Sequence, residues 1–234
     1  MTPVPVYIDL NEYFTNLSMI GYPMEKRGLI MSSIALAQTV LEEVYRRDMR
    51  QAIGHSLAVA KGVADDGLSA ESQAIAICHD VKEDGKIRKI GELLADEDPF
   101  RPVVDADIHS YFGPEYGAEM VYGIDALTIH RGNSRKDYYN WFSKDVVPKK
   151  PEILIIRLRD RENFHRYPFN GEKAKEIAKC EDTLGDFRKM TEDSILQLPE
   201  YLKPKAEKIH RAIQALAKNQ LDGLIHPKSP YYVT

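Results

Sequence analysis

The sequence predicts an all-α protein, because apolar residues recur at helical spacing along most of the chain and no segment alternates convincingly at a period of two. The clearest example lies between residues 30 and 45, where one face of an amphipathic helix carries Ile30, Ile34, Ala37, Leu41, Val44 and Tyr45. One apolar run, Ile153–Ile156, is compatible with a strand or a helix. We expect a helix there, since Pro151 suits a first helical turn and Leu158 continues the apolar face.

Three local signals mark where predicted helices begin. Ser69 is placed to cap a helix that runs through an apolar stretch toward His79. The sequence Gly113-Pro114-Glu115 is typical of a helix start with proline in the first turn. Ser134 opens a capping-box pattern ahead of an aromatic cluster, and such clusters at helical spacing usually belong to a core.

Composition narrows the class of protein. The chain has 234 residues, of which 43% are hydrophobic and 29% charged, as in an ordinary globular protein. The formal charge of −4, from 36 acidic and 32 basic residues, provides no overall positive field for a nucleic acid. Two cysteines are too few for a disulfide scaffold, and we find neither a signal-peptide pattern nor an apolar run that could span a bilayer. We therefore expect a cytoplasmic protein without nucleic-acid or membrane partners.

The chain length fits one generous domain with an appendage. Beyond Gly171 the sequence becomes more charged but keeps helical spacing, and the residues after Ile225 contain two prolines and resemble a tail. We expect a main domain over residues 1–170. Residues 171–234 would form a C-terminal helical extension that packs on it and ends in a short tail.

The segment that carries chemical information runs from His79 to Asp84. On a helix, His79 and Glu83 would be four residues apart, as would Asp80 and Asp84, so all four would share one broad face. An imidazole beside carboxylates, at the end of an apolar helix, suits a divalent cation. The alternative is an acidic helix end in water, capped by Gly85, with the histidine an incidental neighbour.

Two further residues favour the cation. His55 lies on the predicted helix before the one that ends near His79, and packing of successive helices could bring the two side chains together. Asp160 lies deep in the helix that begins at the apolar run Ile153–Ile156. A carboxylate in such a helix needs a partner, and a metal would supply one.

In this order, His55, His79-Asp80 and Asp160 resemble the ligand pattern of the HD-domain metal-dependent phosphohydrolases. Residues 79–84 are similar to the HD-x-x-ED signature of the hydrolase domain in RelA/SpoT-type alarmone hydrolases, including their small single-domain members. Residues 55–60, 112–117, 124–128 and 157–161 are similar to other blocks of that family. The sequence departs from the family pattern in a shortened loop at residues 50–54, in Ile129 where a lysine is usual, and in Phe164 where an asparagine is usual.

This resemblance implies an all-α HD-domain bundle with accessory C-terminal helices, and an enzyme with one divalent cation, expected to be Mn²⁺. Its ligands would be His55, His79, Asp80 and Asp160, with Glu83 and Asp84 orienting or deprotonating the attacking water. Cations near the phosphates would come from Lys82, Arg50, Arg46 and Arg161. The implied activity is removal of pyrophosphate from the 3′ position of (p)ppGpp, with this small phosphorylated nucleotide as partner. The departures fall on the family's nucleotide-binding side, so the resemblance supports hydrolysis more strongly than it supports this substrate.

Several alternatives stay open at this point. The same metal site could act on another nucleotide, such as a deoxynucleoside triphosphate, a nucleoside monophosphate or NADPH. His109 and His130 could hold a second metal in a dinuclear phosphodiesterase, or the chain could be a regulatory or binding module without turnover. We expect Cys78 to be a buried thiol, and we expect His165, His210 and His226 at the surface. The oligomeric state cannot be read from the sequence.

Overall fold

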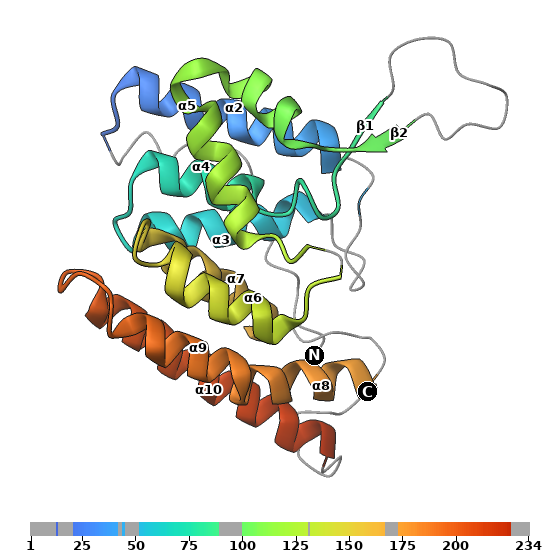
Figure 1. The fold of residues 1–234 in the computed structure, drawn as a ribbon, viewed down its shortest axis with the longest axis vertical. Helices are drawn as coiled ribbons and strands as arrows, with labels where there is room; N and C mark the ends of the chain where they lie inside the picture. The colour runs from blue at the N-terminus through green and yellow to red at the C-terminus, as the bar shows by residue number, and fades with distance from the viewer. Residues whose placement is uncertain are drawn as a thin grey trace, which may run out of the picture. The chain divides into compact units, whose positions relative to one another are not determined.

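A computed structural model of the chain describes residues 13, 21–41, 44, 52–88, 100–130, 132–166 and 173–225. These residues belong to two compact units, Met1–Thr128 and Ile129–Thr234. Each unit is described separately below, with the element labels of Figure 1.

The first unit is built around a short buried helix. Its elements are α2 (Met24–Leu41), α3 (Ala52–Asp65), α4 (Ala70–Cys78), the antiparallel strands β1 (Lys86–Arg88) and β2 (Phe100–Pro102), and α5 (Asp105–Leu127). Helix α4 packs against α2, α3 and α5 (Figure 1). Its last five residues, 74–78, have no exposed surface. A helix that is apolar on every side is stable only when neighbours cover all of it, which the three surrounding helices do.

Two residues determine how α4 begins and how closely α5 packs against it. Ser69 caps α4, and its Oγ accepts a hydrogen bond from the Ser72 backbone N at 3.2 Å, as predicted. Gly123 lets α5 approach α4 closely, because a Cβ at this position would lie 2.4 Å from the Ile75 side chain. The sequence therefore fixes where α4 begins and how near α5 can come.

Helix α5 consists of two helical arms joined at a bend. Gly113 has φ +69° and ψ −174°, a left-handed region that favours glycine, and Pro114 follows at the start of the second arm. The predicted helix start at Gly113-Pro114-Glu115 is confirmed, and it continues directly from the helical arm that precedes it.

In the second unit, the regular elements among the described residues are all helical. Its elements are α6 (Arg135–Trp141), the π-helical turn η1 (Phe142–Val146), α7 (Glu152–Arg166), α8 (Lys173–Leu184), α9 (Asp186–Ile195) and α10 (Lys203–Ile225). Helix α10 packs along α7 and α8, while α9 contacts α6, η1 and α8 (Figure 1). The run Ile153–Ile156 lies in α7 without exposed surface, so the helical interpretation is confirmed.

The all-α prediction is confirmed: within the described residues, β1 and β2 form the one sheet and the other regular elements are helical. The helices predicted beyond Gly171 are present as α8, α9 and α10. The compact units divide after Thr128, inside the range 1–170, and the domain boundary at residue 170 stays a prediction. Among the described helices, none is both long enough and apolar enough to cross a membrane.

The prediction that His165 and His210 are surface groups is wrong. His165 is 4% exposed and His210 is 8% exposed, because α10 packs along α7 and covers the end of the helix that carries His165. The two ring nitrogens of His165 have polar neighbours: Nδ1 lies 2.7 Å from Gln220 Oε1, and Nε2 lies 2.9 Å from Thr183 Oγ1. His226 lies outside the described residues.

Burial makes His165 a source of acid sensitivity. Desolvation lowers the pKa of His165 to about 4, whereas an unfolded chain has a histidine pKa of about 6.5. Between these values the unfolded state binds the proton and the folded state does not, so stability is lost as the pH falls from about 6.5 to about 4. We expect this group to cost about 2 to 3 kcal/mol at pH 4.5 relative to pH 7.

A His165→Gln variant should lose that part of the pH dependence. Urea unfolding, followed by circular dichroism at pH 7 and pH 4.5, compares the variant with the wild type. His130→Gln is the matched control, because His130 is exposed. Equal pH dependence in the wild type and His165→Gln would contradict the assignment.

Candidate metal centre

Three predicted ligands meet in the first unit. His55 comes from α3, while His79 and Asp80 follow the last residue of α4. One potential ligand atom from each residue lies within 4.8 Å of the other two. Asp80 Oδ1 is 3.1 Å from His79 Nε2, and Asp80 Oδ2 is 3.9 Å from His55 Nε2. The structure therefore brings together residues that are separated by more than twenty positions in the sequence.

The position of each side chain in this cluster suits a cation. The side chains of His55 and His79 are 4% exposed, and that of Asp80 is 14% exposed, so the carboxylate lies nearest to solvent. His79 Nδ1 is 2.7 Å from the Ala76 carbonyl oxygen. Because a carbonyl only accepts, Nδ1 carries the proton, and Nε2 is the nitrogen that could ligate. A neutral Nε2 and a carboxylate oxygen 3.1 Å apart are both acceptors, so a proton or a cation between them relieves their repulsion.

The chain reaches this arrangement through a turn. Helix α4 ends at Cys78, and the following residues continue as hydrogen-bonded turns, in which Asp84 N donates to Asp80 O at 2.9 Å and Gly85 N donates to Val81 O at 3.1 Å. The expectation of a regular helix through Asp84 therefore differs from the structure. A Cβ at Gly85 would lie 2.3 Å from Val81 O, so the tight turn requires glycine.

The other predicted catalytic and metal residues lie as follows. Glu83 and Asp84 are exposed, within the turns that follow Asp80. Asp160 belongs to α7 in the second unit, where its Oδ2 is 3.2 Å from Arg157 Nη1 and its side chain is 21% exposed. The catalytic roles of Glu83 and Asp84, and ligation by Asp160, stay predictions.

Two of the predicted substrate cations have partners within the protein. The ammonium group of Lys82 lies 2.6 Å from Asp105 Oδ1 and 2.5 Å from Asp125 Oδ1. Burial disfavours its charge, but the hydrogen bonds to these two carboxylates outweigh burial and raise the pKa of Lys82. Arg161 donates to side chains of α6 and α8 within the second unit. Arg46 and Arg50 lie outside the described residues, and substrate binding by all four cations stays a prediction.

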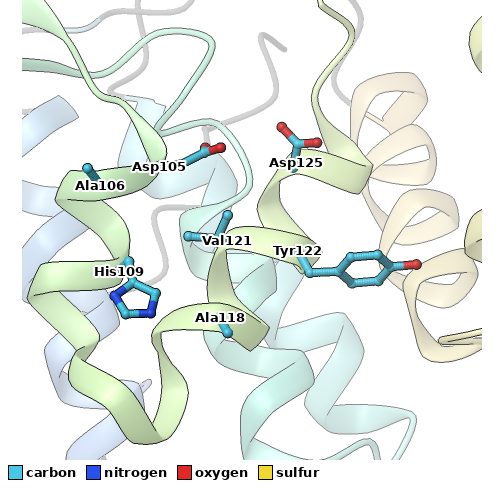
Figure 2. A pocket seen from close by; sticks show the side chains of 7 residues that line it. All are labelled: Asp105, Ala106, His109, Ala118, Val121, Tyr122 and Asp125. Carbon is cyan, nitrogen blue, oxygen red and sulfur yellow. The ribbon is translucent and has the colours of Figure 1, made fainter.

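The two carboxylates that hold Lys82 also line a cavity of about 450 Å³ between the arms of α5 (Figure 2). Its lining residues are Asp105, Ala106, His109, Ala118, Val121, Tyr122 and Asp125. Sequence reasoning missed the contact of Lys82 with Asp105 and Asp125, because it depends on the bend at Gly113 and has no local spacing signal. In the sequence, Asp125 belongs to the block 124–128, which is similar to a block of the alarmone hydrolase family.

The alternative of a dinuclear centre gains no ligand from His109. This residue is exposed and lines the cavity between the α5 arms. Across the described ranges, His55, His79 and Asp80 form the one group of three or more potential ligands that are close enough to share an ion.

Cys78 is a buried thiol, as predicted. It has no exposed surface, and its Sγ lies 3.6 Å from the Ser33 backbone oxygen. Burial raises the pKa of Cys78 to about 12, so the group stays protonated at neutral pH. A donor set of imidazole nitrogen and carboxylate oxygen, without a thiolate, fits a cation such as Mn²⁺.

Comparisons with known proteins support the fold. No protein-family model matches the chain, and no curated protein matches it by sequence. Among solved structures, 17 chains match. One of them is described as a metazoan ortholog of SpoT that hydrolyzes ppGpp and plays a role in starvation responses. It has 14% sequence identity and a TM-score of 0.50, and the match covers 89% of this chain and 98% of that one. At this identity the likeness shows a similar overall fold, and it agrees with the all-α architecture described above.

The cluster of His55, His79 and Asp80 predicts how the loss of one of its side chains changes the affinity for Mn²⁺. His79→Ala and Asp80→Ala should each bind Mn²⁺ at least about tenfold more weakly than the wild type, because each removes a donor from a pre-formed set. Elemental analysis after equilibrium dialysis against Mn²⁺ measures the bound metal. His109→Ala is the matched control and should keep wild-type metal content, since His109 lies outside the cluster. Full metal content in either ligand variant would show that the ligands are wrongly assigned.

Proposed function

We propose that this protein is a metal-dependent nucleotide phosphohydrolase that releases pyrophosphate from the 3′ position of (p)ppGpp. The observation that carries the proposal is the cluster of His55, His79 and Asp80 at the exit of a buried helix. The likeness in fold to a ppGpp hydrolase gives it further support. The proposal includes Mn²⁺ as the cofactor, a small phosphorylated nucleotide as the partner and the cytoplasm as the location.

Four residues would hold the cation, namely His55, His79, Asp80 and Asp160. When bound, the cation would supply a polarised phosphoryl oxygen and a more acidic water. The hydrogen bond from His79 Nδ1 to the Ala76 carbonyl keeps the imidazole in the orientation and tautomer that ligation needs.

Two acidic side chains of the protein would orient the attacking water and accept its proton. Glu83 and Asp84 follow Asp80 by three and four residues and are exposed, in the turns that continue from Asp80. One carboxylate would accept the proton of the attacking water, and the other would orient that water. The backbone hydrogen bond from Asp84 N to Asp80 O couples the position of these acids to the proposed ligand Asp80.

The activity is tested by incubating the purified protein with Mn²⁺ and ppGpp that is labelled in its 3′ pyrophosphate. We expect release of labelled pyrophosphate and formation of a guanosine nucleotide that keeps its 5′ phosphates. Parallel reactions with deoxynucleoside triphosphates, nucleoside monophosphates and NADPH test the alternative substrates. Intact ppGpp after prolonged incubation with a metal-loaded sample would overturn the proposal.

Removal of the proposed proton acceptors should separate catalysis from metal binding. Glu83→Gln and Asp84→Asn should each lower kcat by roughly 100-fold, since a general acid–base group typically contributes that much or more. Both variants should keep wild-type metal content because neither residue is a ligand. Asp65→Asn is the control, an exposed acid at the far end of α3, and should leave kcat unchanged. Wild-type turnover in both Glu83→Gln and Asp84→Asn would exclude this role.

A further inference from the structure

Lys82 lies in the turns that carry the proposed ligand Asp80, and its side chain is nearly buried. The regular helix α4 ends at Cys78, and residues 79–84 continue as turns. Val81 has no exposed surface. The side chain of Lys82 is only 12% exposed, although lysine is one of the residue types least often buried. The segment is therefore packed against the protein at two successive positions.

The ammonium group of Lys82 joins the two ends of α5. Its Nζ lies 2.6 Å from Asp105 Oδ1, in the first turn of that helix, and 2.5 Å from Asp125 Oδ1, in its last turn. In a straight helix these two residues would be about 30 Å apart, because each residue adds about 1.5 Å of length. The bend at Gly113 returns the second arm toward the first, and Figure 2 shows the two carboxylates on opposite arms. One lysine therefore closes the open end of the bent helix.

Two backbone hydrogen bonds span the position of Lys82. Asp84 N donates to Asp80 O at 2.9 Å, and Gly85 N donates to Val81 O at 3.1 Å. A side chain that is held at its tip by two carboxylates also limits the movement of its own backbone, so the ion pairs restrain the segment between these bonds. Ion pairs at a protein surface contribute little to stability, because water and salt screen them. The low exposure of the Lys82 side chain reduces that screening.

The same contacts favour a role for Lys82 other than the predicted one, in which it would bind the phosphates of a substrate. An ammonium group has three N–H donors, and Lys82 directs donors to two carboxylates of the protein. A phosphate oxygen that approached the ammonium group would have to compete with both carboxylates. A role in holding the turns that follow α4 uses the two ion pairs as they are.

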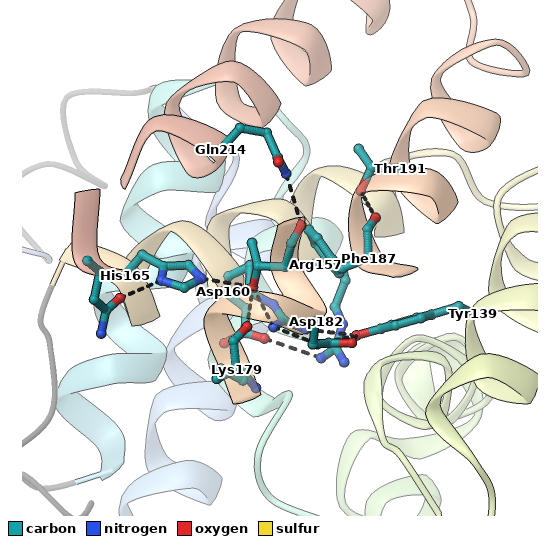
Figure 3. Close-up of polar contacts among 12 residues, drawn as sticks. Tyr139, Arg157, Asp160, His165, Lys179, Asp182, Phe187, Thr191 and Gln214 are labelled. Carbon is teal, nitrogen blue, oxygen red and sulfur yellow. Dashed lines mark hydrogen bonds and ion pairs between the residues drawn. The ribbon is translucent and has the colours of Figure 1, made fainter. Parts of the chain in front are cut away.

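A second predicted substrate cation is engaged in a similar way. Arg161 directly follows the proposed ligand Asp160 on α7, and it donates to Asp182 Oδ2 at 3.0 Å and to Tyr139 Oη at 2.9 Å. Tyr139 Oη also donates to Asp182, as Figure 3 shows. Removal of Arg161 would leave the carboxylate of Asp182, which is 8% exposed, without this ion pair in a buried place. Lys82 is the better residue to test, because its partner Asp105 is exposed.

We propose that Lys82 is a positioning residue, whose ion pairs with Asp105 and Asp125 hold Asp80 in the geometry that the cation requires. Lys82 acts through the turns that follow α4 and touches neither the cation nor the substrate. This inference rests on the metal centre of the proposed function, but it is independent of which nucleotide the protein hydrolyses.

The first test compares the Kd for Mn²⁺, from the electron paramagnetic resonance signal of the free ion, in the wild type and Lys82→Met. This change keeps the aliphatic stem and removes one positive charge, which by charge alone would strengthen the binding of a cation. We expect the opposite, a Kd weakened roughly tenfold, the lower end of the range for residues that orient metal ligands. Lys82→Arg should recover most of the affinity, since it restores a cation between the two carboxylates. Unchanged or tighter binding of Mn²⁺ by Lys82→Met would overturn the proposal.

Arg101→Met is the matched control for this measurement. Arg101 forms a two-bonded ion pair with Asp107, on the same arm of α5 as Asp105, with Nη1 2.6 Å from Oδ2 and Nη2 2.7 Å from Oδ1. This change also removes one cation from α5, but Arg101 lies on β2, outside the turns that carry Asp80. Its affinity for Mn²⁺ should be no weaker than that of the wild type. An equal loss in Arg101→Met and Lys82→Met would show a general loosening of α5 and overturn the proposal.

The second test needs neither metal nor substrate. Amide hydrogen exchange of the metal-free protein, resolved by residue with NMR, reports how often the hydrogen bonds of Asp84 N and Gly85 N open. Both amides should exchange several-fold faster in Lys82→Met than in the wild type, whereas residues 74–78 of α4 should keep their protection. Wild-type protection at both amides, or the same acceleration throughout α4, would overturn the proposal. If Lys82→Met does not fold, Asp125→Asn serves in this test, because Lys82 then keeps its ion pair with Asp105.

Turnover separates this inference from the proposed function. With saturating Mn²⁺, Lys82→Met should lower kcat for ppGpp and leave KM at the wild-type value. A raised KM with unchanged kcat would identify Lys82 as a substrate cation and overturn the inference. A protein that does not hydrolyse ppGpp, but whose affinity for Mn²⁺ depends on Lys82, would retain the positioning role and lose the proposed function. Hydrolysis of ppGpp, with Mn²⁺ affinity independent of Lys82, would retain the function and lose the positioning role.

Discussion

The complete burial of the last five residues of α4 is the constraint on which the first unit depends. Every residue from 74 to 78 is out of contact with solvent, so the helix is fixed by α2, α3 and α5 rather than by its own propensity. Its end point is therefore fixed as well. His79 and Asp80 are the first polar residues beyond that end. Their backbone positions are therefore set by the packing of α4. His55 reaches the same place because α3 packs against α4. A core that is purely apolar thus positions a polar cluster at its boundary.

The sequence predicted those features that depend on short-range patterns. Helical spacing predicted the all-α class, and the caps at Ser69 and Ser134 were placed correctly, because a cap is a contact across only three residues. The approach of His55 to His79 was anticipated from the order of helices together with the family resemblance. The buried state of His165 could not be anticipated, since it depends on α10, which begins almost forty residues later. The contact of Lys82 with both Asp105 and Asp125 likewise requires the bend in α5 at Gly113. A single glycine allows such a bend, but its presence in the sequence does not predict one.

Two lysines illustrate how surroundings decide the behaviour of one residue type. Lys82 lies between two carboxylates, and its ammonium charge is favoured despite partial burial. Lys179 lies among arginines, and its charge is disfavoured by burial and by its neighbours. Lys82 has its ion-pair partners within the protein, and it links the turns that follow α4 to α5.

The protonated state of Cys78 has a chemical consequence for the cluster of His55, His79 and Asp80 beside it. Oxidants and electrophiles attack the thiolate form of cysteine, and a thiol whose pKa is about 12 supplies very little thiolate at neutral pH. The residue immediately before a predicted metal ligand is therefore resistant to sulfenic acid formation and to alkylation. The cluster likewise offers only nitrogen and oxygen donors, so it does not suit soft metal ions that prefer thiolate ligands. The sequence places the sulfur atom of Cys78 next to His79, but the fold buries this thiol away from the cluster's donor atoms.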